Sequence, residues 1–236
     1  MNLVLLDRED FVDHETVVLK GRRLTHLLSV NRVRERDSLV CGFLNGKIGT
    51  GTVTKQTDGF LEMRVELNQE PPEPLPLTLV LALPRPKMLK RIIEAVTTLG
   101  VKNIYLINSW RVEKSFWQSP LMDMEELQKY MILGLEQGRD TTMPQISLHR
   151  FFTKFVTEDL PSISENSLKI LAHPKAGCIC PSGVNTETTL AIGPEGGFID
   201  IEIETLEKQG FLSCHIGPRI LRVETAVTFL ISRLFT

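Results

Sequence analysis

The sequence lacks the long apolar run that a membrane-spanning helix requires. No hydrophobic stretch approaches the ~20 residues that cross a bilayer. Of the 236 residues, 42% are hydrophobic, which is an ordinary share for a globular protein. The N-terminal stretch contains no basic residue and reaches an acid at Asp7, too early for a secretory signal peptide. We therefore expect a cytoplasmic protein that is not associated with a membrane.

Cysteine is also scarce, with four residues that show neither a CxxC pair nor the spacing of a zinc site. Cys178 and Cys180 leave a metal-binding pair open, but no histidine or further cysteine stands at the usual spacing along the chain. Buried or incidental thiols in a reducing cytoplasm are the favoured interpretation. The sequence therefore predicts no metal centre.

A strong excess of charge of either sign is absent, because the formal net charge is −2. Basic residues nevertheless gather between residues 20 and 36, where Glu35 is the only acid. A local basic patch of this kind attracts phosphate groups even on a nearly neutral chain. A solvated charged face explains the same pattern equally well, so both interpretations stay open.

A proline-rich segment divides the chain, since four of residues 71–76 are proline and such a stretch favours an extended linker. The residues before it carry strand patterns, two of which are joined by the hairpin signal Asn45-Gly46. The expected strands are residues 38–44, 47–54 and 60–67, with a short helix over residues 22–30. We predict a small β-barrel domain over residues 1–70.

After the linker, strands alternate with helices, and this order predicts an α/β domain with parallel strands over residues 77–236. The expected strands are residues 77–83, 103–107, 168–172, 189–192 and 211–216. The expected helices cover residues 87–99, 121–137 and 223–234, and one more begins near Asp200, a candidate N-cap. Gly100 is well placed to end the first of these helices.

Two glycine- and proline-rich segments lie in the last fifth of the chain, Ala191–Phe198 and Ile216–Ala226. Glycine lets a backbone pass close to a ligand, and a loop at the carboxyl end of a strand is where an open α/β sheet holds small ligands. The pair therefore predicts a binding pocket, with two ordinary strand–helix turns as the alternative. Neither segment contains the Lys-Ser/Thr of a P-loop or a GxGxxG pattern, which disfavours an enzyme that binds nucleotide phosphates.

These two segments resemble the RsmE-type 16S ribosomal RNA uridine-N3 methyltransferases of the SPOUT class, whose sequences combine a GPEGG loop with a stretch that reads LGPRILRxETA. Here the first is Gly193–Gly197 and the second is Ile216–Ala226, with Ile in place of the leading Leu. Weaker matches are His26–Arg32, Leu99–Val101, Glu136–Arg139, Pro144 and Ala172–Pro174. Departures at Ala95, Thr98, Arg139 and Lys175 suggest a divergent subgroup.

The resemblance implies a PUA-like N-terminal barrel and a C-terminal domain whose parallel sheet carries a deep trefoil knot. It also implies a homodimer with its active site at the subunit interface. The cofactor would be S-adenosyl-L-methionine, and the partner would be ribosomal RNA or the small ribosomal subunit. The expected cofactor-binding residues are Leu171, His173, Ile192, Gly193, Glu195, Gly196, Gly197, Ile216, Gly217, Leu221, Arg222, Thr225 and Ala226.

Methylation at N3 of uridine requires a base, or a cation that stabilises the anionic ring, because the N3–H group is barely nucleophilic while protonated. Glu224 is a candidate base, since burial raises a carboxyl pKa, although a carboxylate that caps the last helix is at least as good an interpretation. Arg222 or Arg219 would stabilise charge on uridine, or pair with Glu195 or Glu224. By analogy with the family, Arg139 would reach the pocket of the partner subunit.

N3 lies on the Watson–Crick edge, so the target base must be unpaired or flipped out. The residues expected to contact RNA are Arg22, Arg23, Arg32, Arg34, Arg85, Lys87 and Arg219. Trp110, Phe116 and Trp117 would stack on bases, or instead pack in the core or at a dimer contact. Two further hypotheses stay open, a non-catalytic RNA-binding or assembly protein and a SPOUT methyltransferase that acts on another RNA.

Overall fold

The protein, described over residues 2–236 by a computed structural model, divides into two compact units. The first unit takes the chain up to Glu73 together with Met131–Met143, and the second takes Pro74–Tyr130 and Pro144–Thr236. The sequence predicted a single boundary at residues 71–76. It did not predict that residues 131–143 belong to the first unit. Periodicity predicts a helix over residues 121–137, but it does not say which sheet the end of that helix packs against.

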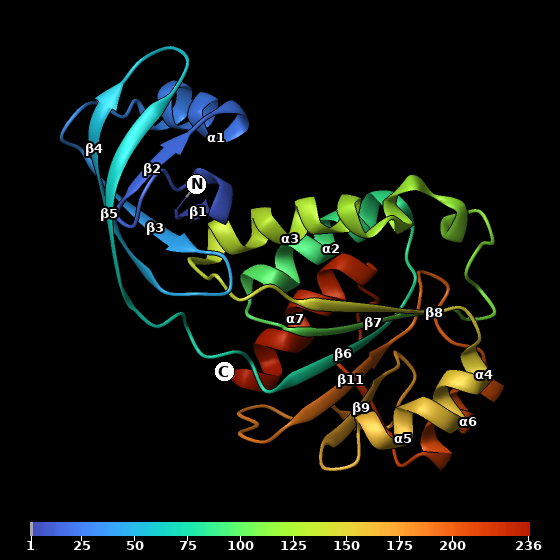
Figure 1. Ribbon diagram of the computed structural model, residues 1–236. Helices are drawn as coiled ribbons and strands as arrows, with labels where there is room; N and C mark the ends of the chain where they lie inside the picture. The colour runs from blue at the N-terminus through green and yellow to red at the C-terminus, as the bar shows by residue number, and fades with distance from the viewer. Residues whose placement is uncertain (1) are drawn as a thin grey trace. The chain divides into compact units, whose positions relative to one another are not determined.

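The first unit contains one five-stranded sheet, in the order β1-β3-β4-β5-β2 (Figure 1). The strands are β1 (Val4–Leu6), β2 (Thr16–Leu19), β3 (Ser38–Phe43), β4 (Ile48–Gln56) and β5 (Leu61–Gln69). β3, β4 and β5 form an antiparallel meander and confirm the three strands expected there, whereas β1 pairs parallel with β3 and was not predicted. Helix α1 (Gly21–His26) runs into a π-helical turn, η2 (Leu27–Asn31), and a short 3-10 helix, η1 (Arg8–Asp10), follows β1.

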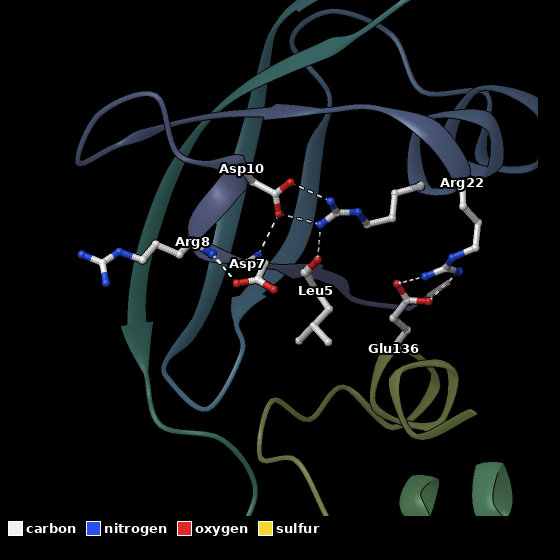
Figure 2. A network of polar contacts seen from close by, with 7 residues as sticks. Leu5, Asp7, Arg8, Asp10, Arg22 and Glu136 are labelled. Atoms are coloured by element: carbon white, nitrogen blue, oxygen red, sulfur yellow. Dashed lines mark hydrogen bonds and ion pairs between the residues drawn. The ribbon is translucent and has the colours of Figure 1, made fainter. Parts of the chain in front are cut away.

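Two arginines of the predicted basic patch form ion pairs within the first unit (Figure 2). The Arg23 guanidinium donates to both carboxylate oxygens of Asp10 at 2.6 Å and to the Leu5 carbonyl oxygen at 2.7 Å. Arg22 donates to the two carboxylate oxygens of Glu136 at 3.0 and 2.8 Å, and the Glu136 side chain is only 4% exposed. These pairs give Arg22 and Arg23 a structural role within the first unit, and contact of these two residues with RNA stays a prediction.

Replacing Arg22 by alanine should lower the free energy of unfolding by about 2 kcal/mol, because it leaves the buried Glu136 carboxylate without its cation. Urea unfolding followed by circular dichroism measures the change. The matched control is Arg64→Ala, which removes an ion pair to Glu15 whose side chains are 71% and 58% exposed. That control should cost less than about 0.5 kcal/mol. Equal losses in the two variants would contradict a structural role for Arg22.

The second unit is built on a seven-stranded sheet in the order β10-β12-β9-β11-β6-β7-β8, and each recorded pairing is parallel. The strands are β6 (Leu77–Ala82), β7 (Asn103–Ile107), β8 (Gln145–His149), β9 (Leu168–Ala172), β10 (Cys178–Ile179), β11 (Thr188–Ile192) and β12 (Leu212–His215). The central strands β6 and β11 are buried, and for β6 the apolar run of residues 77–83 predicted burial on both faces. The α/β class and the parallel sheet are thereby confirmed, while β8 and β10, at the sheet edges, were not predicted.

Helices cover both faces of this sheet, with α2 and α7 on one face and α5 and α6 on the other (Figure 1). The helices are α2 (Pro86–Thr98), α3 (Met124–Gly138), α4 (Phe152–Lys154), α5 (Leu160–Ile163), α6 (Asp200–Lys208) and α7 (Val223–Phe235). Short helical turns are η3 (Phe116–Gln118), η4 (Pro120–Met122) and η5 (Phe155–Asp159). Gly100 follows α2 with φ +88°, as expected of a residue that ends a helix. None of the helices within residues 2–236 is both long and apolar enough to cross a membrane.

The start of α6 differs from the sequence expectation. Asp200 is the first helical residue and the N-cap position belongs to Ile199, so Asp200 is not the cap. An isoleucine side chain cannot accept a hydrogen bond, and the cap is instead supplied by Glu202, whose Oε2 accepts from the Ile199 backbone N–H at 3.0 Å. The helix therefore begins with a carboxylate that folds back onto the preceding loop.

Candidate functional site

A cavity of about 110 Å³ lies where the loops after β11 and β12 meet, at the carboxyl ends of β9, β11 and β12. Its walls come from residues 172–174, from residues 192–195 and 197, from residues 214–217 and 219–221, and from Val223, Ala226 and Leu230 of α7. The lining includes nine of the residues expected to bind a cofactor: His173, Ile192, Gly193, Glu195, Gly197, Ile216, Gly217, Leu221 and Ala226. The two glycine-bearing segments therefore lie together, as a built pocket requires.

Four residues with the same expected role do not line this cavity: Leu171, Gly196, Arg222 and Thr225. The Leu171 side chain is buried within the sheet, where its residue pairs with Ala191 of β11. Arg222 and Thr225 are exposed at the start of α7. Position along the chain placed them beside the loop, but the direction of each side chain decides whether it reaches the cavity.

The loop after β11 depends on glycine at two positions. A Cβ atom on Gly193 would lie 2.8 Å from the Phe198 backbone nitrogen, closer than real Cβ contacts, and 3.1 Å from the Gly197 backbone, which is also a tight contact. Gly197 has φ +71°, a conformation that residues with a side chain rarely adopt, and its N–H donates to the Pro194 carbonyl at 2.7 Å. The loop thus folds tightly on itself and presents backbone rather than side chain to the cavity.

Gly196 has a different surrounding from the one expected. Gly196 was expected to bind the cofactor, yet a Cβ there would meet the Arg111 side chain at 2.8 Å. The Arg111 guanidinium also donates a hydrogen bond to the Gly196 carbonyl oxygen. Gly196 therefore faces the loop that follows β7, and not the cavity.

A buried carboxylate joins this loop to the segment after β7. Glu202 is 5% exposed, and its Oε1 accepts from the Trp110 backbone N–H at 2.8 Å while its Oε2 accepts from Ile199. Glu195 is held from another direction, since its Oε1 accepts from the Arg85 backbone N–H at 3.0 Å. Sequence reasoning missed Arg111 and Glu202, although a glutamate three residues after a helix N-cap is a recognisable capping signal.

The loop after β12 is more exposed than the first. Gly217 has φ +119° and its N–H donates to Nδ1 of His215 at 3.0 Å, whereas Ile220 is 83% exposed. Arg219 and Arg222 are exposed as well. No ion pair connects these arginines to Glu195 or Glu224 within residues 2–236, so that alternative is not supported.

The expected catalytic residues lie at two places in the chain, the start of α7 and the end of α3. Glu224 is half-buried in the first turn of α7, and Arg222 is the N-cap residue of the same helix. A carboxylate there also interacts favourably with the helix dipole, so the capping interpretation stays open. Arg139 follows α3 in the first unit, with φ +55° and an exposed side chain.

The two tryptophans have different surroundings. Trp110 is 80% exposed, whereas Trp117 is buried and its indole N–H donates to Asn108 Oδ1 at 2.9 Å, so Trp117 packs in the core.

The cysteine thiol that lines the cavity is unreactive at neutral pH. Cys214 lines the cavity, and its pKa is raised first by a hydrogen bond with the Cys180 thiol and second by burial, so it stays protonated at neutral pH. All four cysteines are free, and Cys178 alone is exposed. Over the described part of the chain, no group of three His, Cys, Asp or Glu residues is arranged to hold a metal ion.

Comparison with known sequences finds relatives along most of the chain. The profile of a family described as "RNA methyltransferase domain" matches residues 71–235. The ribosomal RNA small subunit methyltransferase E of Treponema pallidum is 30% identical over 233 residues, which cover 96% of this chain and 87% of that protein. The protein of the same name from Bacillus subtilis is 26% identical and covers 96% of this chain and 92% of its own length.

Solved structures agree with this fold at lower sequence identity. The ribosomal RNA small subunit methyltransferase E of Neisseria gonorrhoeae, crystallised with S-adenosyl methionine, matches with a TM-score of 0.76 and 22% identity, covering 98% of this chain and 95% of that one. A putative methyltransferase of Legionella pneumophila, also with bound cofactor, matches with a TM-score of 0.73 and 23% identity over 98% of this chain and 95% of its own. At these identities the two structures support the fold.

Proposed function

The chain belongs to the RNA methyltransferase family, and on that premise we propose that it methylates N3 of a uridine in small-subunit ribosomal RNA with S-adenosyl-L-methionine as methyl donor. The observation that supports this proposal most is the cavity between two glycine-bearing loops, in a chain that aligns over 96% of its length with a ribosomal RNA methyltransferase. A PUA-like first unit, a trefoil knot, a homodimer and a cytoplasmic location belong to the same proposal.

The residues of the cavity fit such a cofactor. Ile192, Leu221 and Ala226 give apolar walls for an adenine ring, and the glycine backbone of the first loop leaves amide and carbonyl groups to bind its polar edge. S-adenosylmethionine supplies a methyl group already activated by a sulfonium. The cavity of about 110 Å³ is smaller than the ~300 Å³ of typical ligand pockets, so we propose that the exposed loop of residues 216–222 moves outward on binding.

The task of the other residues is to make N3 nucleophilic. We propose Glu224 as the base that removes the N3 proton, because it is half-buried at the start of α7 and its carboxylate has no hydrogen bond or ion pair among the described residues. Arg222, two residues earlier, would stabilise negative charge on a uridine oxygen. Arg139 would contribute to the partner subunit's site in the proposed homodimer.

RNA contacts in this proposal fall on basic residues that the fold leaves exposed. Arg32 and Arg34 follow η2 in the first unit, and Arg85 and Lys87 lie at the start of α2 in the second. Arg219 is exposed in the loop after β12. Contacts from such side chains to phosphates position an RNA but do not specify its sequence.

Two measurements test the proposed function. Isothermal calorimetry with S-adenosylmethionine should show saturable binding, and absence of binding would favour the non-catalytic RNA-binding hypothesis. Modified nucleotides in ribosomal and transfer RNA from a deletion strain should lack one N3-methylated uridine in the small-subunit RNA. A methyl group missing from another RNA would instead support a SPOUT methyltransferase of different specificity.

Replacing Glu202 by glutamine should weaken S-adenosylmethionine binding about tenfold and lower the free energy of unfolding by about 2 kcal/mol. The amide has one acceptor oxygen, so one of the two backbone N–H groups that Glu202 now satisfies would lose its partner. Calorimetry and urea unfolding measure the two effects. Glu204→Gln, on the exposed side of α6, is the control and should change neither quantity appreciably. Unchanged cofactor affinity in the Glu202 variant would show that this carboxylate does not order the loop.

A further inference from the structure

We propose that the segments after β7 and β8 form a second RNA-binding surface, which stacks unpaired bases beside the cofactor loop. This surface, called here the aromatic–basic surface, consists of Trp110, Arg111, Arg150, Phe151 and Lys154. The inference rests on the proposed function, because it takes RNA as the substrate. It adds a place on the second unit where nucleotides next to the target uridine are held.

The sheet topology brings the two segments together. β7 and β8 are parallel neighbours with Ile107 opposite His149, and the Asn108 N–H donates to the His149 carbonyl at 2.8 Å. Trp110 and Phe151 therefore lie at the same edge of the sheet, since Trp110 is two residues after Asn108 and Phe151 is two residues after His149. Both strands end on the side where β11 ends and the cofactor loop begins, because every strand of the sheet runs in the same direction.

Contacts tie this surface to the proposed cofactor loop. Arg111 donates to the Gly196 carbonyl, and the Phe152 ring lies 5.9 Å from the ring of Phe198. The Trp110 backbone is fixed by Glu202, so its side chain projects from a rigid segment. RNA held here would therefore lie next to the loop that, in the proposed function, holds the methyl donor.

Exposure of the two aromatic side chains marks a binding surface. Trp110 is 80% exposed and Phe151 is 73% exposed, in contrast to Trp117 at 8%. Exposed aromatic rings beside cations are the platforms on which proteins stack unpaired bases. The Arg150 guanidinium packs over the Trp117 ring at 5.4 Å, which holds this cation in place beside Phe151.

A hollow beside Phe151 has the size and chemistry for a base. Its volume is about 310 Å³, and its lining includes His149, Arg150, Phe151, Lys154 and Asp159. His149 packs on the Phe155 ring at 4.3 Å, and its Nδ1 lies 3.5 Å from Asp159. Burial lowers the pKa of His149 against the opposing charge of Asp159, which favours the neutral ring, and a neutral imidazole can both donate to and accept from a base edge.

Charge favours RNA over a second copy of this chain as the occupant. Arg111, Arg150 and Lys154 are exposed cations, and Asp159 is the only acid that lines the hollow. A two-fold contact between copies of this surface would set these cations against one another. A phosphate backbone would instead neutralise them while its bases stack on the aromatic rings.

Fluorescence anisotropy with a short fluorescein-labelled oligouridylate tests the proposal on the full chain without S-adenosylmethionine. Trp110→Ala and Phe151→Ala should each weaken binding about tenfold. Lys154→Ala should reduce the slope of log K against log salt by about 0.7, the value of one phosphate contact to a single strand. Leu212→Ala and Lys208→Ala are the controls, since Leu212 is 61% exposed and Lys208 is an exposed cation at the end of α6, and neither should alter binding.

Affinity within twofold of the parent chain in both aromatic variants would overturn the proposal. So would a change of oligomeric state in Trp110→Ala by analytical ultracentrifugation, because it would assign the surface to a contact between copies. Calorimetry with S-adenosylmethionine separates this result from the proposed function. The aromatic variants should keep the parent affinity for the methyl donor, whereas failure of the proposed function would appear as absence of that binding in the parent chain itself.

Discussion

Replacing Gly193 by alanine should weaken S-adenosylmethionine binding roughly 100-fold, the equivalent of about 3 kcal/mol of overpacking. The new Cβ would lie 2.8 Å from the Phe198 backbone nitrogen and 3.1 Å from backbone atoms of Gly197. Backbone cannot move aside as a flexible side chain can, so the loop itself must open and lose its shape. Calorimetry with the methyl donor measures the affinity.

The control for this change is Gly177→Ala. A Cβ on Gly177 meets no heavy atom within 4 Å, and this glycine belongs to the same unit. The control should bind as the parent chain does. Urea unfolding of the Gly193 variant shows whether the chain still folds, because a folded variant with parent-like affinity would refute the role of this loop in binding.

Glutamine in place of Glu224 should lower kcat by about 10² to 10⁴ while S-adenosylmethionine affinity stays within twofold. The amide keeps the size of the side chain and its place in the first turn of α7, but it cannot accept the uridine N3 proton. Single-turnover methylation of a small-subunit RNA substrate measures the rate. The pH–rate profile should also lose the limb that reports the base.

The competing interpretation of Glu224 makes a different prediction. If the carboxylate only interacts with the helix dipole, Glu224→Gln should cost about 0.3–1 kcal/mol of stability and leave kcat unchanged. Glu125→Gln supplies the scale for that effect, because Glu125 is an exposed acid in the first turn of α3. A parent-like kcat combined with a stability loss equal to that of the control would assign Glu224 to capping.

Several elements followed from local patterns. Residues 103–107 and 168–172 were predicted as strands and form β7 and β9 with the same bounds, because each is a short, mostly apolar run. The parallel arrangement followed from the alternation of strands with helices. Gly193, Gly197 and Gly217 marked the loops, because close backbone approach and positive φ are constraints that the residue itself records.

Short edge strands did not carry enough pattern. β1 has three residues and β10 has two, so neither shows an alternation that could be distinguished from a loop. The first unit also includes residues 131–143, and the helical part of this segment, up to Gly138, has the same period whichever unit the helix end packs against. These parts of the fold depend on contacts between distant segments.

The sequence by itself determined the alternating α/β order, the parallel sheet and the two glycine-bearing loops, since each depends on neighbours within a few residues. Only the tertiary structure decided which side chains are free to act. Arg22 pairs with Glu136 across 114 positions, and Trp110 is fixed by Glu202 across 92. Contacts of this kind are set by how the strands are ordered in the sheets, and no local pattern records that order.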